Sequence, residues 1–219
     1  MSMFKREYHY FLSERGRLYH LIDPQPFLTR GALPCGPAFL SNAKYLHFFW
    51  THLRRTPRSA PHAERFPFVS LCGPEANYLA GDDAPVVFTD LALAEGGSGD
   101  PGAGDGLLKF AGGSMEQQFD ADRLRTTNDR LYHPVDGLKH AATVAPVPRA
   151  FAREHGIDTD GDGAKPVPSR FVTSDGTLYG MLDSPMAIEL GFGHIDDVAE
   201  DTYEITMGGR SMRIPSLPE

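Results

Sequence analysis

The stretch SNAKYLHFFWTHLRR, residues 41–55, decides the fold that we expect. Ser41 or Asn42 provides the side-chain acceptor typical of a helix N-cap. Apolar side chains then recur at spacings of three and four residues, which places them on one face of an amphipathic helix. They are Phe39, Ala43, Leu46, Phe49, Trp50 and Leu53. Pro57 ends the predicted helix, because proline cannot continue the backbone hydrogen bonds. The sequence therefore predicts one principal helix with a broad apolar face.

Two aromatic residues of this helix, Tyr45 and Phe48, fall on the opposite side from the apolar face. Two interpretations follow. Either a second layer of the protein covers them, which is the usual fate of aromatic side chains at helical spacing, or they form an aromatic surface for a partner.

Strand patterns flank the helix on both sides. Residues 7–12 alternate aromatic and polar side chains, and residues 17–21 resume this pattern after a polar turn, which predicts a β-hairpin. Residues 66–72 and 85–91 are rich in Val and Phe, and we expect them to pair antiparallel. Residues 186–194, 202–207 and 210–214 also have strand patterns. We predict an α+β fold, a mainly antiparallel sheet with one principal amphipathic helix packed on it.

The length and composition predict a single domain over residues 1–219. Of these residues 41% are hydrophobic and 11% aromatic, which is enough apolar material for a sizeable core. The Gly- and Asp-rich residues 96–106 lack apolar anchors, so they predict a surface loop. The composition of residues 137–178 turns to Ala, Pro, Gly and Asp, which predicts an inserted segment.

Charge and apolar run lengths exclude several classes of partner. The formal net charge of −8 is unfavourable for binding phosphate backbones, so we expect no nucleic-acid partner. The apolar runs are far shorter than the roughly 20 residues that span a bilayer, so we expect no membrane insertion. The chain enters strand-like sequence almost at once, without a secretory signal pattern. Two cysteines, Cys35 and Cys72, are expected to be reduced thiols. We therefore expect a soluble intracellular protein of the cytoplasm or mitochondrial matrix.

A calcium-like pattern lies in the predicted inserted segment. Asp158, Asp160 and Asp162 alternate with other residues before Gly163, as in the first half of a calcium-binding loop. The twelfth position, however, is Ser169 in place of the bidentate Glu that such loops use. The motif leaves two alternatives: a weak structural calcium site, or an acidic turn in solvent. No other cofactor is expected.

A second group of residues could carry chemistry or bind a ligand. Cys72, Glu75 and Asn77 place a thiol, a carboxylate and an amide within one turn at a strand end. A Cys-His nucleophile also needs an imidazole, and His133 is our candidate. The alternative is structural, since strand-end cysteines are commonly small core residues and polar side chains in turns commonly bond backbone amides.

Several segments together resemble an uncharacterised protein family of the UPF class, number 0598. They are REYHY at 6–10, FPFVSLCGPEAN at 66–77, DAPVVFT at 83–89, LYHP at 131–134, AIEL at 187–190 and the hairpin around 208–209. The resemblance implies a small soluble domain whose animal members are associated with mitochondria, and it supplies no catalytic residue. This chain differs from animal members in lacking an evident targeting extension and in having the acidic insertion.

The sequence leaves two main hypotheses for function. The first is a non-enzymatic binding or assembly module with a protein partner, because aromatic residues are available on the helix and first hairpin and no complete catalytic motif is present. The second is a small-molecule enzyme or ligand-binding protein that uses Cys72, Glu75, Asn77 and His133. Calcium-dependent regulation through Asp158, Asp160 and Asp162 is a third, weaker hypothesis.

Overall fold

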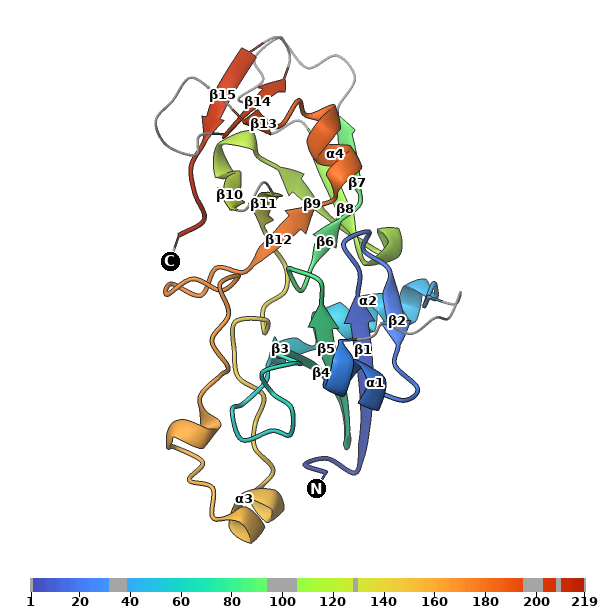
Figure 1. Ribbon diagram of the computed structural model, residues 1–219, viewed down its shortest axis with the longest axis vertical. Coiled ribbons are helices and arrows are strands. Elements are labelled where there is room, and N and C mark those ends of the chain that lie inside the picture. Colours follow the sequence, from blue (N-terminus) through green and yellow to red (C-terminus); the bar gives the residue numbers. More distant parts are fainter. Residues whose placement is uncertain are drawn as a thin grey trace.

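The structure is a computed structural model that describes residues 2–31, 39–93, 106–127, 130–194, 203–207 and 210–218. Within these residues the strands form four sheets (Figure 1). The first sheet has the order β2-β1-β5-β4-β3. Its strands are β1 (Arg6–Leu12), β2 (Leu18–His20), β3 (Leu53–Arg55), β4 (Phe68–Cys72) and β5 (Glu75–Gly81).

The other three sheets lie at the opposite end of the molecule from α3 (Arg149–His155) (Figure 1). The second sheet contains β10 (Arg125–Thr127), β11 (Arg130–Pro134), β12 (Tyr179–Leu182) and β6 (Val87–Phe88), in that order. The third contains β7 (Asp90–Leu93), β8 (Gly106–Phe110) and β9 (Met115–Phe119). The fourth contains β13 (Gly193–His194), β14 (Tyr203–Met207) and β15 (Arg210–Ile214).

Short helices connect and cover these sheets. The α-helices besides α3 are α1 (Gln25–Arg30), α2 (Ala43–Thr51) and α4 (Ser184–Glu189). Single 3-10 turns are η1 (Ala111–Gly113), η2 (Ala121–Arg123) and η3 (Asp162–Ala164). The predicted α+β class is confirmed. The expectation of one mainly antiparallel sheet was too coarse, because β1 pairs parallel with β5 and β12 pairs parallel with β6.

Helix α2 begins as predicted but ends earlier. The side chain of Asn42 accepts a hydrogen bond from the Tyr45 amide at 3.0 Å, which confirms the N-cap. At the other end the Thr51 hydroxyl donates to the carbonyl of His47, at 2.9 Å. The predicted continuation to Arg55 is wrong, because residues 53–55 form β3 and pair with β4. Tertiary pairing overrides helical propensity here.

Alternate residues of each strand point to opposite faces of the first sheet, and both faces are buried. On one face Tyr10, Leu12 and Leu79 join a hydrophobic cluster with the buried residues of α2. These helix residues are Leu46, Phe49 and Trp50. On the other face Phe11 and Tyr78 join a second cluster, which includes Phe27 of α1 and Phe66.

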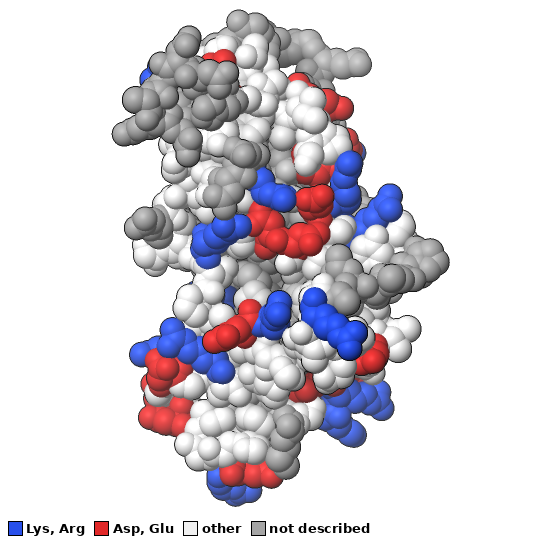
Figure 2. Space-filling model, in the orientation of Figure 1, with Lys and Arg blue, Asp and Glu red and all other residues white. Residues whose placement is uncertain are grey.

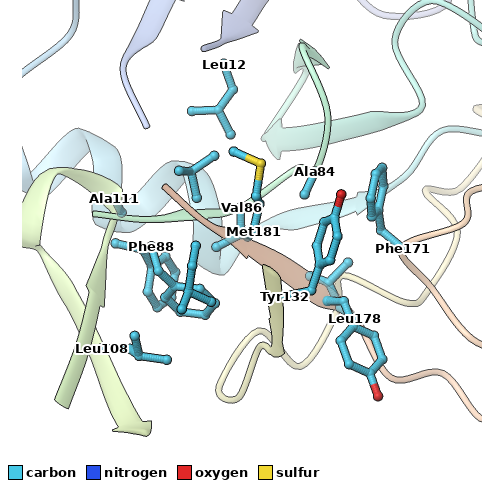
Figure 3. Packing of buried hydrophobic residues seen from close by; sticks show 14 of the residues in the cluster. Leu12, Ala84, Val86, Phe88, Leu108, Ala111, Tyr132, Phe171, Leu178 and Met181 are labelled. Carbon is cyan, nitrogen blue, oxygen red and sulfur yellow. The ribbon is translucent and has the colours of Figure 1, made fainter. Parts of the chain in front are cut away.

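The first of these clusters continues into the second and third sheets (Figure 3). Tyr132 on β11 lies beside Phe171, with ring centroids 5.8 Å apart. Phe88 on β6 meets Phe110 on β8 edge to face at 5.5 Å. The same cluster also includes Ile205 on β14 and Ile214 on β15 of the fourth sheet. Because one apolar core reaches all four sheets, these sheets stabilise one another through burial worth roughly 1.5–3 kcal/mol for each large side chain.

Two predicted strands are corrected by the structure. Residues 85–91 do not form one strand that pairs with β4: they divide into β6 and β7 in different sheets, and β4 pairs with β5. Residues 186–194 do not form one strand: residues 186–189 belong to α4, and only Gly193–His194 at the end of the range form a strand, β13. Asp183 caps this helix by accepting from the Met186 amide at 3.2 Å. The hairpins of β1 with β2 and of β14 with β15 are confirmed.

Residues 137–178, predicted as an insertion, pack along the free side of β3. The amide of Arg55 donates to the Thr143 carbonyl at 2.8 Å, and the Ala145 amide donates to the Arg55 carbonyl at 2.9 Å. The buried side chains of this segment include Ala145 and Val167, which belong to the second cluster. The segment therefore closes one edge of the first sheet. Of the predicted loop at 96–106, residues 96–105 lie outside the described residues.

Candidate functional site

A groove lined largely by aromatic side chains lies beside α2 on the first sheet. We call it the aromatic groove, and its volume is about 320 Å³. It is lined by Tyr8, Tyr10, Tyr45, Phe48, Cys72, Glu75 and Asn77. Three of the four residues that we singled out as candidates for chemistry, Cys72, Glu75 and Asn77, thus share one concavity.

Strand register explains why these residues meet. Tyr8 is paired with Asn77 across the parallel β1–β5 ladder, and Cys72 is paired with Glu75 across the antiparallel β4–β5 ladder. Paired residues in a sheet point to the same face, so all four line one surface. Helix α2 lies on this face, and its residues Tyr45 and Phe48 complete the groove.

Two tyrosines tie the helix to the sheet at this site. The hydroxyl of Tyr45 donates to the hydroxyl of Tyr10 at 2.8 Å. Burial raises the pKa of Tyr45, and the hydrogen bond to Tyr10 raises it further. Burial also raises the pKa of Tyr10. Both phenols therefore stay neutral at physiological pH, and the groove presents aromatic rings in place of phenolate charge.

The polar side chains of the groove differ in their exposure and in whether they already form hydrogen bonds. Asn77 is only 5% exposed, and its amide nitrogen donates to the Ser70 carbonyl at 3.1 Å. Glu75 accepts a hydrogen bond from the Arg6 guanidinium at 2.8 Å. Cys72 is a free, exposed cysteine. The thiol is accordingly the polar group of the groove that is open to an incoming molecule.

His133 lies elsewhere, on β11 of the second sheet. It is fully buried, its Nδ1 lies 2.7 Å from the Pro134 carbonyl, and its Nε2 accepts from the Asp120 amide at 3.2 Å. Its ring also contacts Phe119, with centroids 5.8 Å apart. The structure therefore does not bring His133 into the groove with Cys72, and its nitrogens serve internal hydrogen bonds.

The calcium-like residues are held by contacts within their own region. Asp162 forms ion pairs with Arg58 at 3.1 Å and with Lys165 at 3.3 Å. The hydrogen bond from Arg58 lowers the pKa of Asp162. Asp158 accepts from the amide of Asp160 at 2.9 Å. In the described part of the chain, no three acidic, histidine or cysteine side chains converge as metal ligands. Calcium binding stays a prediction, which calorimetric titration at millimolar calcium tests.

One polar cluster was not predicted from the sequence. Asp83, whose side chain is 3% exposed, accepts hydrogen bonds from Tyr132 and Arg170 and lies 3.7 Å from Arg130. Arg130 also pairs with Glu14 at 3.2 Å. We call this set the Asp83 cluster. Because its members come from distant parts of the sequence, no local sequence pattern predicts this cluster.

Charged side chains of both signs lie next to one another on the face shown in Figure 2. Ion pairs of the described residues include Arg58 with Asp162, Arg123 with Asp136 and Arg130 with Glu14. Separately, the helices of the described ranges all lack the length and apolar character needed to cross a bilayer.

The family comparison covers most of the chain. A family model described as a domain of unknown function, DUF4505, matches residues 2–171. The chain belongs to this family, so it is a member of an uncharacterised family, as the sequence indicated. Membership of the UPF class number 0598 and mitochondrial residence stay predictions.

Two solved structures show a weak overall likeness to this chain. One is a DUF1285 family protein from Shewanella baltica OS155, with 13% identity, a TM-score of 0.40, and coverage of 82% of this chain and 87% of that one. The other is a DUF1285 family protein from Silicibacter pomeroyi DSS-3, with 12% identity, a TM-score of 0.39, and coverage of 100% and 84%. At these values the likeness carries no argument about this chain.

Proposed function

We propose that this chain is a non-enzymatic binding module that contacts a protein partner through the aromatic groove. The observation that carries the proposal is the set of rings from β1 and α2 around one concavity of about 320 Å³. Tyrosine and phenylalanine contribute large contact areas at low entropic cost, and they are enriched where proteins bind one another. Phe48 is the groove residue best suited to a test, because it is half-buried and its ring contact within the described residues is a stack on the neighbouring His52, at 4.1 Å.

The test compares two matched surface variants. Phe48→Ser removes a ring from the groove, whereas Ile188→Ser removes an exposed apolar side chain of α4, which is 73% exposed. Tagged protein is recovered from gently lysed cells, and co-purifying proteins are quantified by mass spectrometry. We expect the same partner with wild type and Ile188→Ser and at least a tenfold loss with Phe48→Ser. Recovery of free monomer in every case, or equal recovery with both variants, contradicts the proposal.

A second candidate function is small-molecule binding or catalysis at the same groove. The exposed Cys72 thiol beside Glu75 and Asn77 favours it. Among the residues that line the groove there is no histidine to act as a base, so the binding version is better supported than the nucleophilic one. Reaction of Cys72 with a set of small thiol-directed fragments, compared with Cys72→Ser, tests it. If no fragment labels Cys72 faster than it labels free cysteine, the groove does not hold small molecules beside the thiol and this candidate function is rejected.

The compartment is also a proposal. The resemblance to the UPF class number 0598 supports the mitochondrial matrix, and the free Cys72 agrees with any reducing compartment, the cytoplasm included. Fractionation of cells that express the tagged full-length protein separates these two locations. Recovery in a secreted or membrane fraction contradicts both.

A further inference from the structure

Half of strand β1 has an open edge. β1 pairs with β5 along all seven of its residues, from Arg6 to Leu12, but its pairing with β2 extends only from Tyr10 to Leu12. No described strand lies beside residues 6–9 on the β2 side. One backbone hydrogen bond reaches this stretch from that side, from the Leu21 amide to the His9 carbonyl at 2.8 Å.

The direction of this bond shows which backbone groups face the opening. The amide and carbonyl of one strand residue point to the same edge, and successive residues alternate. Since the His9 carbonyl points toward the β2 side, the amide and carbonyl of Glu7 point there as well, while those of Arg6 and Tyr8 point toward β5. Glu7 therefore offers one donor and one acceptor to a neighbouring strand.

A hollow of about 480 Å³ runs along this edge. Residues 5–9 form one wall, and Leu21, Ile22 and Pro24 form the opposite wall, where the chain leaves β2 toward α1. The hollow also reaches Tyr8, which lines the aromatic groove. Tyr8 therefore lines both the space for an added strand and the surface that we propose for partner binding.

The opposite edge of the same sheet is treated differently. Beside β3, Arg55 exchanges backbone hydrogen bonds with Thr143 and Ala145, and the Val167 amide donates to the Thr56 carbonyl at 3.0 Å. The fold thus closes that edge with residues 137–178. Proteins commonly cover or block such edges because an unpaired strand recruits another chain. The β1 edge at residues 6–9, in contrast, has no strand beside it among the described residues.

The walls of the hollow indicate the chemistry of the segment that fits. Ile22 is 89% exposed, so it offers an apolar contact. Lys5 is exposed and adds positive charge, whereas the carboxylate of Glu7 is occupied by the amides of Met3 and Phe4 at 2.6 and 3.0 Å. An extended segment with an apolar residue against Ile22 and an acidic residue beside Lys5 is complementary to these walls.

We propose that the open edge of β1 receives an extended segment of the partner protein as an added strand. This inference rests on the proposed binding function and specifies its mode, in which backbone hydrogen bonds give affinity and alternate side chains give specificity. The exposed Lys5 beside the edge is the kind of charge that discourages aggregation of an unoccupied strand edge.

The test uses a phage-displayed library of random nonapeptides selected on the wild-type protein. Enriched peptides are synthesised with single N-methyl groups moved along the backbone, and binding is measured by fluorescence anisotropy. We expect affinity to fall about two- to tenfold at alternate positions and to change little at the positions between them, since each lost edge hydrogen bond is worth roughly 0.5–1.5 kcal/mol and about 1.4 kcal/mol corresponds to tenfold. Hydrogen exchange of the Glu7 amide slows when such a peptide binds.

Two protein variants complete the design. Glu7→Pro removes the edge-facing amide, whereas the matched Glu7→Gln keeps it and removes the charge. We expect Glu7→Pro to weaken peptide binding at least tenfold and Glu7→Gln to retain it. Three results would each overturn the inference. The first is that binding does not alternate with the position of the N-methyl group, and the second is that no peptide that contacts residues 5–9 is enriched. The third is a dimer of this chain paired through the edge. If Phe48→Ser lost partner capture and both Glu7 variants kept it, the aromatic groove would remain the proposed binding site and the added strand would be rejected.

Discussion

The hydroxyl of Tyr132 on β11 donates a hydrogen bond to the buried carboxylate of Asp83, in the turn between β5 and β6. Arg170 donates to the other oxygen of the same carboxylate. One side chain thus joins the first sheet, the second sheet and the segment 137–178. The first and second sheets are therefore linked by a polar contact as well as by the shared apolar core.

We predict that Asp83→Ala destabilises the protein by about 2 kcal/mol. Removing one partner of a buried ion pair costs roughly 3–5 kcal/mol, but Arg130 and Arg170 are 35% and 51% exposed and regain water when the carboxylate is lost. The control is Asp90→Ala, which breaks the exposed pair with Lys109 and should cost at most about 1 kcal/mol. Urea unfolding measures both. Equal losses for the two variants would show that burial of the Asp83 carboxylate is unimportant.

The pH response of stability should reflect His133. Burial lowers the pKa of its imidazole in the folded protein below the ordinary value of 6.5. Between these two pKa values the unfolded chain binds more protons than the folded one, so the free energy of unfolding decreases as the pH falls below about 6.5. Burial also lowers the pKa values of His9 and His20, which act in the same direction.

Site-resolved NMR separates His133 from the other histidines. The imidazole carbon signals of His133 should titrate below pH 6.5, and His133→Gln should be less stable at pH 7 with a flatter decline in acid. A midpoint for His133 at or above 6.5 would contradict the burial argument.

The sequence predicted those elements whose signals are local. The hairpin of β1 with β2 follows from alternation around a polar turn, and the cap of α2 follows from Asn42. The end of α2 was wrong because the pairing of β3 with β4 is decided by tertiary contacts. Helix α4 was missed although Asp183 followed by Pro185 is a helix-start signal, because the apolar residues after it also fit a strand.

Only the part of the candidate site whose residues are close in sequence could be predicted. Cys72, Glu75 and Asn77 are close in sequence, and they do share the aromatic groove. His133 was proposed from residue type alone, and its distance from β4 could not be known without the sheet order. The parallel pairing of β1 with β5, which brings Tyr8 beside Asn77, joins residues 69 positions apart in register and leaves no local pattern.

The hydrogen bond between Tyr10 and Tyr45 can be measured by a double-mutant cycle. Tyr10→Phe, Tyr45→Phe and the double variant each keep the rings and remove hydroxyls. We expect a coupling free energy of about 1 kcal/mol, because the bond is partly buried and each single change leaves one hydroxyl without its partner. Urea unfolding provides the values. Strictly additive effects would indicate that the two hydroxyls do not interact in solution.

Two neighbouring glycines allow backbone strain to be separated from packing. Gly112 and Gly113 both have positive φ angles, 64° and 80°, which L-residues adopt at a cost of roughly 1–2 kcal/mol. A Cβ at Gly112 would also lie 2.8 Å from a methyl carbon of Leu46, whereas a Cβ at Gly113 meets no atom within 4 Å. Leu46 is 3% exposed on α2, so it has little room to move away. We therefore expect Gly113→Ala to cost about 1 kcal/mol and Gly112→Ala about 1–3 kcal/mol more, the range for overpacking a core. Thermal and urea unfolding of the two variants check this order, and a Gly113→Ala variant as unstable as Gly112→Ala would show that backbone strain alone accounts for the loss.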